Sequence, residues 1–287
     1  MQRAGGSLRR APDPMPMLKE CASLLKDLAG AGVEIDGKAL MEIGTGRRLE
    51  MPFGMYLCGA ASVVTLDLNP LLKEHLVLKS IAAMSAERSQ ILDCFAEVAD
   101  RRDVDRRFDL LCSAQSLKDV LERTGIDYRA PSDATKPILS PASIDVQFSY
   151  TVFEHVPRSI LVGILQECNR LLRPGGVAIH HIDPSDHFAH EDDSISFINF
   201  LRFSDREWHC LAGNRFAYHN RLRASEYEAI YREAGHEILQ WKPVVDQRGH
   251  SLLQNGFPLD AKFQDRPPED LATVVLRIVS RPTPVST

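Results

Sequence analysis

The sequence predicts a doubly wound α/β domain with a mainly parallel sheet, and three observations support this. Short apolar or β-branched runs alternate with longer segments of helical periodicity over most of the 287 residues. The first apolar run ends directly in glycines, and a later helical segment ends in Pro-Gly-Gly before another apolar run. Strands that alternate with helices form parallel sheets with right-handed crossovers. We therefore expect one α/β domain with helical insertions and an active-site cap.

The chain opens with a segment that lacks apolar periodicity. Residues 1–16 are rich in Gly, Pro and Arg, and a helix is expected at about 17–30. We expect an N-terminal tail and helix at 1–36, followed by the main domain at 37–287. The basic residues of the tail precede no apolar segment of the kind found in secretory signals.

A β-α-β unit is predicted next. An apolar run at 39–46 ends in glycines, the segment 52–61 begins a helix, and a β-branched run at 62–70 ends in Asn-Pro. The helical pattern of 71–125 predicts an insertion. In the second half of the sequence, strands are predicted within 126–134 and 144–156, followed by a helix around 158–172 and a strand at 175–183. A cap is predicted at 184–222. The remaining predicted elements are a helix at 224–235, a strand at 236–245, a loop through Pro267 and Pro268, and a final strand at 272–280.

Composition narrows the classes of function. The chain has 34 basic and 39 acidic residues, a net charge of −5, and no long run of like charges. A nucleic acid partner is therefore not expected. No apolar window is long enough for a transmembrane helix, so no membrane partner is expected either. The six cysteines are scattered without a Cys-x-x-Cys pair, which favours buried thiols in a reducing, cytoplasmic setting.

The strongest local motif is the glycine loop Glu42-Ile43-Gly44-Thr45-Gly46, with Asp67 at the tip of the next strand, 21 residues after Gly46. Glycines let the backbone turn sharply and approach a nucleotide-like ligand. An acidic side chain at the second strand tip can accept both hydroxyls of a ribose. The pattern predicts a nucleotide-type cofactor site, although Asp67 also fits the role of a helix N-cap.

Four motifs together carry a resemblance to a known family. The sequence EIGTG, followed by TLDLN, IDVQFSYTVFEHV and LLRPGGVAIH, resembles the class I S-adenosylmethionine-dependent methyltransferases over about 39–182. The resemblance implies a Rossmann-like, seven-stranded sheet whose last strand is antiparallel, with S-adenosylmethionine as cofactor and S-adenosylhomocysteine as product. The remainder resembles a bacterial subgroup that acts on small molecules or glycans. One departure is Arg48, which stands where the family usually has a third glycine.

The same resemblance implies roles for individual residues. The glycine loop would line the methionine end of the cofactor, Asp67 would hold the ribose, and Leu68 would lie under the adenine. Asp133 would meet the adenine amino group, although an ordinary turn residue is the alternative there. The full set of expected cofactor residues is Glu42, Gly44, Gly46, Asp67, Leu68, Asp133, Ala134, Ser149, Tyr150 and His155.

Histidine density is the other unusual feature. Four of the ten histidines, His180, His181, His187 and His190, fall within eleven residues at and after the predicted fifth strand. Open α/β sheets bind ligands at this carboxyl edge. Three interpretations remain open: a general base oriented by an Asp, a divalent metal site, or histidines that pack as polar loop residues.

Within this cluster the general-base interpretation is the one we adopt, and no metal ligand is assigned. His187 is predicted to be the base, with Asp186 or Asp183 orienting it, and His181 is predicted to contact the substrate or a metal. Strand alternation predicts that His180 and His181 point to opposite faces of the sheet.

A polar and aromatic segment follows the cluster. It is predicted to supply substrate contacts, and an Arg there can bind a carboxylate or phosphate through paired donors. Phe197, Phe200 and Phe203 are spaced for an amphipathic helical face packed as a lid. The predicted substrate-binding residues are His190, Arg202, Tyr218, Asn220 and Arg221.

The predicted activity is methyl transfer from S-adenosylmethionine to a nucleophile on a small molecule or glycan, in an in-line displacement. A hydroxyl acceptor is favoured, because a hydroxyl has to lose a proton and the histidines can take it. The alternatives are an N- or C-methyltransferase, a metal-dependent O-methyltransferase, an NAD-dependent oxidoreductase, and a catalytically inactive cofactor-binding partner protein. An RNA methyltransferase is disfavoured by the acidic balance. The expected state is a monomer or homodimer.

Overall fold

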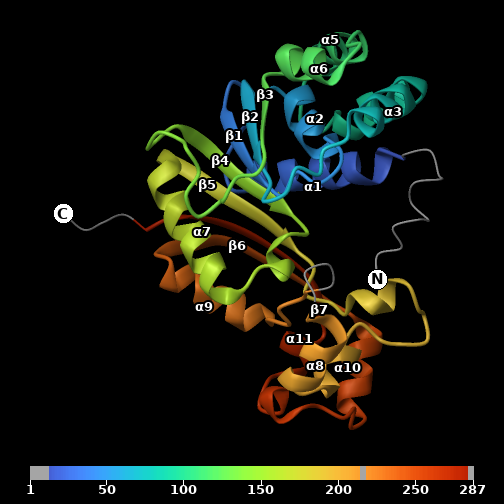
Figure 1. Ribbon diagram of the computed structural model, residues 1–287, viewed down its shortest axis with the longest axis vertical. Helices are drawn as coiled ribbons and strands as arrows, with labels where there is room; N and C mark the ends of the chain where they lie inside the picture. The colour runs from blue at the N-terminus through green and yellow to red at the C-terminus, as the bar shows by residue number, and fades with distance from the viewer. Residues whose placement is uncertain (1–12, 214–217, 284–287) are drawn as a thin grey trace.

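A single seven-stranded sheet forms the centre of the protein (Figure 1). The computed structural model describes residues 13–213 and 218–283. The strand order is β3-β2-β1-β4-β5-β7-β6. The strands are β1 (Ala39–Ile43), β2 (Ser62–Leu66), β3 (Ile126–Arg129), β4 (Ile144–Tyr150), β5 (Leu172–Ile182), β6 (His236–Val245) and β7 (Thr273–Pro282).

The sheet is parallel except at β7. Strand β1 pairs in parallel with β2 and β4, β2 pairs with β3, and β4 pairs with β5. Strand β7 runs antiparallel between β5 and β6. The strand order reverses beside β1, and ligands bind open α/β sheets outside the carboxyl ends at such a switch point. The predicted doubly wound fold and its antiparallel last strand are confirmed.

Helices cover both faces of the sheet (Figure 1). Helices α7 and α9 pack on one face, around a core that includes Leu165, Tyr227 and Tyr231. The other face carries a larger core, to which α1 contributes Leu18, Cys21 and Leu25. The helices are α1 (Met15–Gly30), α2 (Glu50–Leu57), α3 (Glu74–Ala86), α4 (Arg88–Phe95), α5 (Arg101–Cys112), α6 (Leu117–Thr124), α7 (Arg158–Leu171) and α9 (Ala224–Glu233).

The four helices α3 to α6 lie between β2 and β3, in the range where the sequence predicts a helical insertion. Local residues set their ends. The Asp100 carboxylate accepts the N–H groups of Arg102 and Asp103 at the start of α5, and the Ser116 hydroxyl caps α6. Gly125 ends α6 in the left-handed conformation. Within the described ranges, no helix combines the length and apolarity needed to cross a membrane.

A small cap stands beyond the carboxyl ends of the central strands, and its core joins two separate parts of the chain. The first part, after β5, holds η2 (His187–His190), η3 (Asn199–Arg202) and α8 (Asp205–Ala212). The second part, between β6 and β7, holds α10 (Gln247–Gln254), η4 (Ala261–Phe263) and α11 (Pro268–Leu271), so the loop expected there is instead largely helical.

The buried face of the cap differs from the predicted amphipathic lid. Phe200 is fully buried, but the turn that carries it is a single 3₁₀ turn rather than a longer helix. Its ring packs against Trp208, at 5.6 Å between ring centroids. The phenylalanine spacing that predicted a helical lid therefore belongs to a compact turn that packs into the core of the cap.

A buried arginine ties the two parts of the cap together. Arg223 is fully buried and donates to the carbonyls of Pro184, Arg221 and Leu271. Its guanidinium also lies 5.0 Å from the ring centre of Phe200. Burial lowers the pKa of Arg223 to about 10, which leaves it charged at neutral pH. Its hydrogen bonds offset the cost of burying that charge.

Candidate active site

The glycine loop after β1 has a backbone that only glycine adopts easily. Gly44 and Gly46 have φ of +87° and +69°. A Cβ atom on Gly44 would lie 2.4 Å from Cγ2 of Val152, whereas a Cβ atom on Gly46 would meet nothing within 4 Å. The loop is therefore closed toward the segment after β4 and open at Gly46.

Asp67 joins this loop to the end of β2. One carboxylate oxygen accepts the N–H of Gly46 at 2.9 Å, and the other accepts the N–H of Asn69 at 2.9 Å. A carboxylate has about four acceptor sites, so two remain for a ligand. Leu68, the next residue, is 67% exposed, as an apolar platform for a base would be. The helix N-cap alternative does not apply, because the next helix begins at Glu74 with Lys73 as its cap.

Glu42 lies beneath the loop rather than at its surface. The hydroxyl of Thr65 donates to its carboxylate, and the Thr45 hydroxyl lies 2.5 Å from that of Thr65. Burial raises the pKa of Glu42 to about 8, with the Thr65 hydrogen bond acting in the opposite direction. The structure thus places Glu42 as an internal support of the glycine loop.

The loop after β3 reaches the same edge. The N–H of Ser132 donates to the carbonyl of Asp67 at 2.8 Å, which brings the exposed Asp133 beside the β2 tip. The Thr135 N–H and hydroxyl donate to one oxygen of Asp133, at 2.8 and 2.7 Å, and lower its pKa. Ala134 is buried beneath this turn. Both of these hydrogen bonds use Oδ1, and the contact of Asp133 with an adenine amino group stays a prediction.

The end of β4 carries two predicted cofactor residues with different surroundings. Ser149 is fully buried, and its hydroxyl bonds Nδ1 of His180 at 2.7 Å. This burial argues against the predicted cofactor contact of Ser149. Tyr150 is half-buried on the opposite face, where its ring lies 4.4 Å from that of His181. Thr151, which follows, has an uncommon φ of +50° that turns the chain sharply at the strand end.

His180 and His181 lie on opposite faces of β5, as strand alternation predicts. His180 stacks on Phe153 on the side of α9, with 4.1 Å between ring centroids. His181 faces α1, and its Nδ1 accepts from Nε of Arg277 at 3.0 Å. Burial lowers the pKa of His180 to about 3 and that of His181 to about 4.

The contact with Arg277 corrects the catalytic role predicted for His181. Arg is only a donor, so the Nδ1 lone pair of His181 is already used and Nε2 carries the proton. An imidazole in this state cannot act as a base. The guanidinium of Arg277 also donates to Glu20 of α1 at 2.6 Å, so this group connects the N-terminal helix to the last strand.

Three imidazoles and two carboxylates converge where β4 and β5 end. Oδ2 of Asp183 lies 3.1 Å from Nε2 of His190 and 3.6 Å from Nε2 of His187. Glu154 and His155, from the turn η1 (Phe153–His155), each place a ligand-type atom within 4.8 Å of one on His187. Of the predicted site residues, Asp183, His187, His190 and His155 are therefore brought together. We use the name His187 cluster for these four residues together with Glu154.

Hydrogen bonds outside the cluster orient its members. The Ser185 N–H and hydroxyl donate to Oδ1 of Asp183, at 3.0 and 2.5 Å, which directs Oδ2 toward the imidazoles. Nδ1 of His155 donates to the carbonyl of Tyr218 at 2.9 Å, because a carbonyl only accepts. The remaining lone pair of His155 is then on Nε2.

Glu154 is the residue that sequence analysis missed. It is fully buried, and neither carboxyl oxygen makes a hydrogen bond within the described part of the chain. Burial raises the pKa of Glu154 well above its usual range and lowers the pKa of His187. Nε2 of His187 is also buried without a hydrogen bond in the same set of residues. The only signal in the sequence was that Glu154 directly precedes His155.

Asp186 does not orient His187. Its carboxylate accepts the N–H of Phe188 at 2.9 Å and caps the turn η2, and its own N–H donates to Phe197. Burial raises the pKa of Asp186. Asp183, the other predicted orienting residue, is the carboxylate next to His187.

Two predicted substrate-binding residues are used inside the protein, which corrects their roles. The amide of Asn220 donates to the carbonyls of Phe153 and Val156, at 2.8 Å each, and so supports the turn that carries Glu154. Arg221 is buried and pairs with Asp205. Neither side chain is free to hold a substrate.

The other two predicted substrate residues remain predictions. Arg202 is exposed, with its guanidinium 5.7 Å from the ring centre of Phe203. Tyr218 is half-buried, and its carbonyl accepts from His155 in the cluster. Among residues 13–213 and 218–283, neither side chain makes a hydrogen bond that would exclude a substrate contact.

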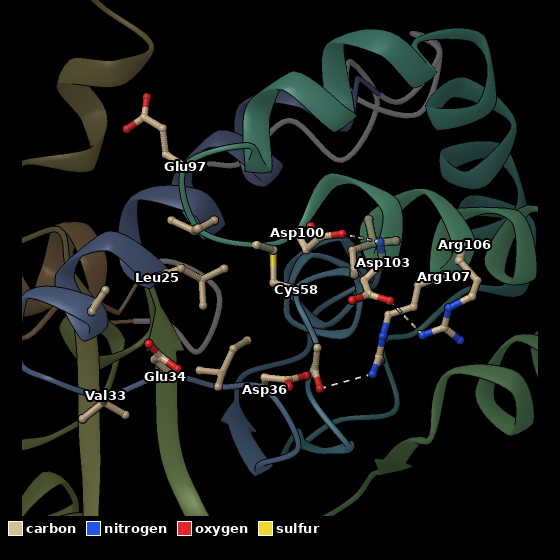
Figure 2. A pocket seen from close by; sticks show the side chains of 16 residues that line it. Leu25, Val33, Glu34, Asp36, Cys58, Glu97, Asp100, Asp103, Arg106 and Arg107 are labelled. Carbon is tan, nitrogen blue, oxygen red and sulfur yellow. Dashed lines mark hydrogen bonds and ion pairs between the residues drawn. The ribbon is translucent and has the colours of Figure 1, made fainter.

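A separate hollow lies at the opposite edge of the sheet (Figure 2). It has a volume of about 570 Å³ and is lined by residues that include Asp36, which precedes β1, and Gly59, which precedes β2. It therefore opens at the amino ends of these strands. Its Arg107 donates to three main-chain carbonyls, one of them that of Gly59. This hollow is distinct from the carboxyl-edge site.

Comparison with known proteins agrees with the predicted class. The family model of the methyltransferase domain matches residues 103–180, which run from α5 through β4 to β5. The match covers less than half of the chain, and over these residues the chain is similar to a methyltransferase domain. This agrees with the class predicted by resemblance, which implies S-adenosylmethionine as the cofactor. The bacterial small-molecule or glycan subgroup stays a prediction.

Several solved structures are similar to this chain in fold. A protein from Bacillus halodurans C-125, described as a methyltransferase, is 14% identical and has a TM-score of 0.45 over 90% of this chain and 96% of its own. An S-adenosylmethionine-dependent methyltransferase from Mesorhizobium loti is 16% identical, with a TM-score of 0.43 over 89% and 96%. Magnesium protoporphyrin IX methyltransferase from Synechocystis PCC 6803 is 10% identical, with a TM-score of 0.47 over 93% and 83%. No curated protein matches the sequence.

The residues of the carboxyl edge fit the cofactor of this methyltransferase. Gly46 leaves open space where a Cβ atom would stand, and Asp67 keeps acceptor sites for two ribose hydroxyls. The exposed Leu68 can cover one face of an adenine. When bound, S-adenosylmethionine supplies an electrophilic methyl group on a cationic sulfur.

Proposed function

We propose that this methyltransferase transfers the methyl group to a hydroxyl oxygen of a small molecule or glycan. The observation that carries the proposal is the His187 cluster, which gathers imidazoles and carboxylates at the edge where the acceptor must lie. An alcohol oxygen becomes a good nucleophile as its proton is removed, whereas a neutral amine attacks without losing one first. Such a cluster therefore serves a hydroxyl better than an amine.

The segment after β4 links the cluster to the cofactor loop. The side chain of Val152 covers Gly44, and two residues later the same segment supplies Glu154. A methyl acceptor between the two groups would meet the cluster with its oxygen. In the displacement, the oxygen forms its bond to the methyl carbon as the bond from that carbon to sulfur breaks, and the hydroxyl proton passes to Nε2 of His187.

The protein contributes alignment and exclusion of water as well as proton removal. Holding two reactants in an in-line geometry lowers the entropic part of the barrier. The cap supplies the wall of the site on the acceptor side, and Asn220 and Arg223 hold it against the sheet domain. We propose that the acceptor lies between this wall and the cofactor.

The test measures release of S-adenosylhomocysteine with sets of acceptors that differ only in the nucleophile. Paired alcohols and amines on the same sugar or phenyl scaffolds are compared for the wild type and for His187→Ala. We expect turnover of a hydroxyl acceptor that is lost in His187→Ala, with cofactor affinity unchanged. Turnover of an amine that is equal in the two proteins would contradict the proposal.

A further inference from the structure

Imidazole nitrogens and carboxylate oxygens converge in the His187 cluster with the spacing of a metal site. Donor atoms about 2.0–2.2 Å from an ion in tetrahedral geometry lie about 3.3–3.6 Å from one another. Oδ2 of Asp183 is 3.1 Å from Nε2 of His190 and 3.6 Å from Nε2 of His187. Small adjustments of these side chains would bring all three atoms onto one ion.

The orientation of these groups also matches that of metal ligands. Ligands are usually held by a second layer of hydrogen bonds that fixes which atom faces the ion. Ser185 occupies Oδ1 of Asp183 and leaves Oδ2 for the cluster. The edge of the His219 ring packs on His187, with 4.6 Å between centroids, and Nε2 of His219 donates to the carbonyl of Asp183.

Glu154 provides an independent observation. It is fully buried, neither of its oxygens has a hydrogen bond among residues 13–213 and 218–283, and it shares a ligand-type grouping with His155 and His187. Ionising a buried carboxyl group without a partner costs several kcal/mol. A cation bound in the cluster would compensate that charge.

We propose that the His187 cluster binds one divalent transition-metal ion through Asp183, His187 and His190, with Glu154 as a further carboxylate beside His187. Two imidazoles favour Zn²⁺, Fe²⁺ or Ni²⁺ over Mg²⁺, which prefers an all-oxygen shell.

The proposed ion would also take part in activating the acceptor. An ion held by these residues would lower the pKa of a hydroxyl bound to it and so would favour loss of the hydroxyl proton. In this arrangement His187 is a ligand rather than the base. This reading of the ion's role rests on the proposed transfer to a hydroxyl, whereas metal binding itself does not.

The experiment is a calorimetric titration of untagged, chelator-treated full-length protein with ZnCl₂, repeated with MgCl₂. We expect one Zn²⁺ per chain and much weaker binding of Mg²⁺. Loss of a ligand in His187→Ala or Asp183→Asn should weaken Zn²⁺ binding by at least about 100-fold, since even outer partners of metal ligands change affinity by 10–100-fold. The matched control is His250→Ala, which removes a histidine paired with Glu269 at 3.1 Å outside the cluster and should leave binding unchanged.

Three results would overturn the proposal. The first is the absence of saturable Zn²⁺ binding to the wild type, and the second is equal loss of affinity in His250→Ala and His187→Ala. The third is unchanged affinity in Glu154→Gln, an isosteric variant that removes the charge and would show that Glu154 takes no part. Titration of the same samples with S-adenosylhomocysteine separates the two claims, because failure to bind it counts against the proposed function and not against the metal site.

Discussion

Replacing Asp67 by Ala tests the cofactor site most sharply. The carboxylate holds the N–H groups of Gly46 and Asn69, each at 2.9 Å, and keeps two acceptor sites for the ribose hydroxyls. A hydrogen bond to a charged group contributes about 1.5–3 kcal/mol. Loss of two such bonds therefore costs about 3–6 kcal/mol, which corresponds to roughly 10²–10⁴-fold in Kd at 1.4 kcal/mol per tenfold.

The assay is calorimetric titration of the wild type and of Asp67→Ala with S-adenosylhomocysteine. The matched control is Asp127→Ala in the neighbouring strand β3, where the exposed carboxylate pairs only with Arg129 among the described side chains. We expect the control to bind as the wild type does. A Kd for Asp67→Ala within about threefold of the wild type, less than 1 kcal/mol, would refute the assignment of Asp67 to the ribose.

Three further predictions concern stability. Gly44→Ala should lower the free energy of unfolding by about 2–5 kcal/mol, measured with urea, because the φ of +87° and the contact with Val152 both oppose a Cβ atom. Adding Val152→Ala should restore only the steric part of this loss. Full recovery in the double variant would show that the backbone carries no strain. His181 has a folded pKa of about 4, below the unfolded value of about 6.5, so the stability it contributes is lost as pH falls from 6.5 through 4. His181→Asn should flatten the stability curve in that window by up to about 1.4 kcal/mol per pH unit, and an unchanged slope would contradict the burial argument. Arg223→Met should lower the free energy of unfolding in urea by about 2–4 kcal/mol, because three main-chain carbonyls lose a charged donor. A loss below about 1 kcal/mol would show that the cap does not depend on the hydrogen bonds of Arg223.

The sheet and the cofactor loop could be predicted because their signals are local. Apolar runs, helical periodicity and the glycines at 44 and 46 each specify structure within a few residues of themselves. The acid at the second strand tip follows at a fixed distance that the β-α-β unit imposes. Alternation along β5 likewise placed His180 and His181 on opposite faces without any knowledge of their neighbours.

The roles of individual polar residues were harder to predict, because their partners are far away in the sequence. His181 looked free to contact a substrate or a metal, but Arg277, 96 residues later, occupies its lone pair. Arg221 looked free to bind an anion, but it is buried against Asp205. Nothing in a local pattern reveals which of several charged groups a fold will bring together.

The cap shows the same limit for secondary structure. Its core is shared between the segment after β5 and the segment between β6 and β7. The helices α10 and α11 are short, at eight and four residues, and too short for a periodicity that can be distinguished from a loop. Phe263 is fully buried there only because Trp208 and Phe200 from the other segment complete the core.

The measurement that tests the central claim most directly is a calorimetric titration of the wild-type protein with S-adenosylmethionine, S-adenosylhomocysteine and NADH. Both methyltransferase ligands carry the ribose for which Asp67 is proposed, and the loop lacks the later glycine with which dinucleotide sites meet a pyrophosphate. We predict saturable binding of S-adenosylmethionine and S-adenosylhomocysteine at one site per chain, and no binding of NADH. Binding of NADH alone would contradict the account.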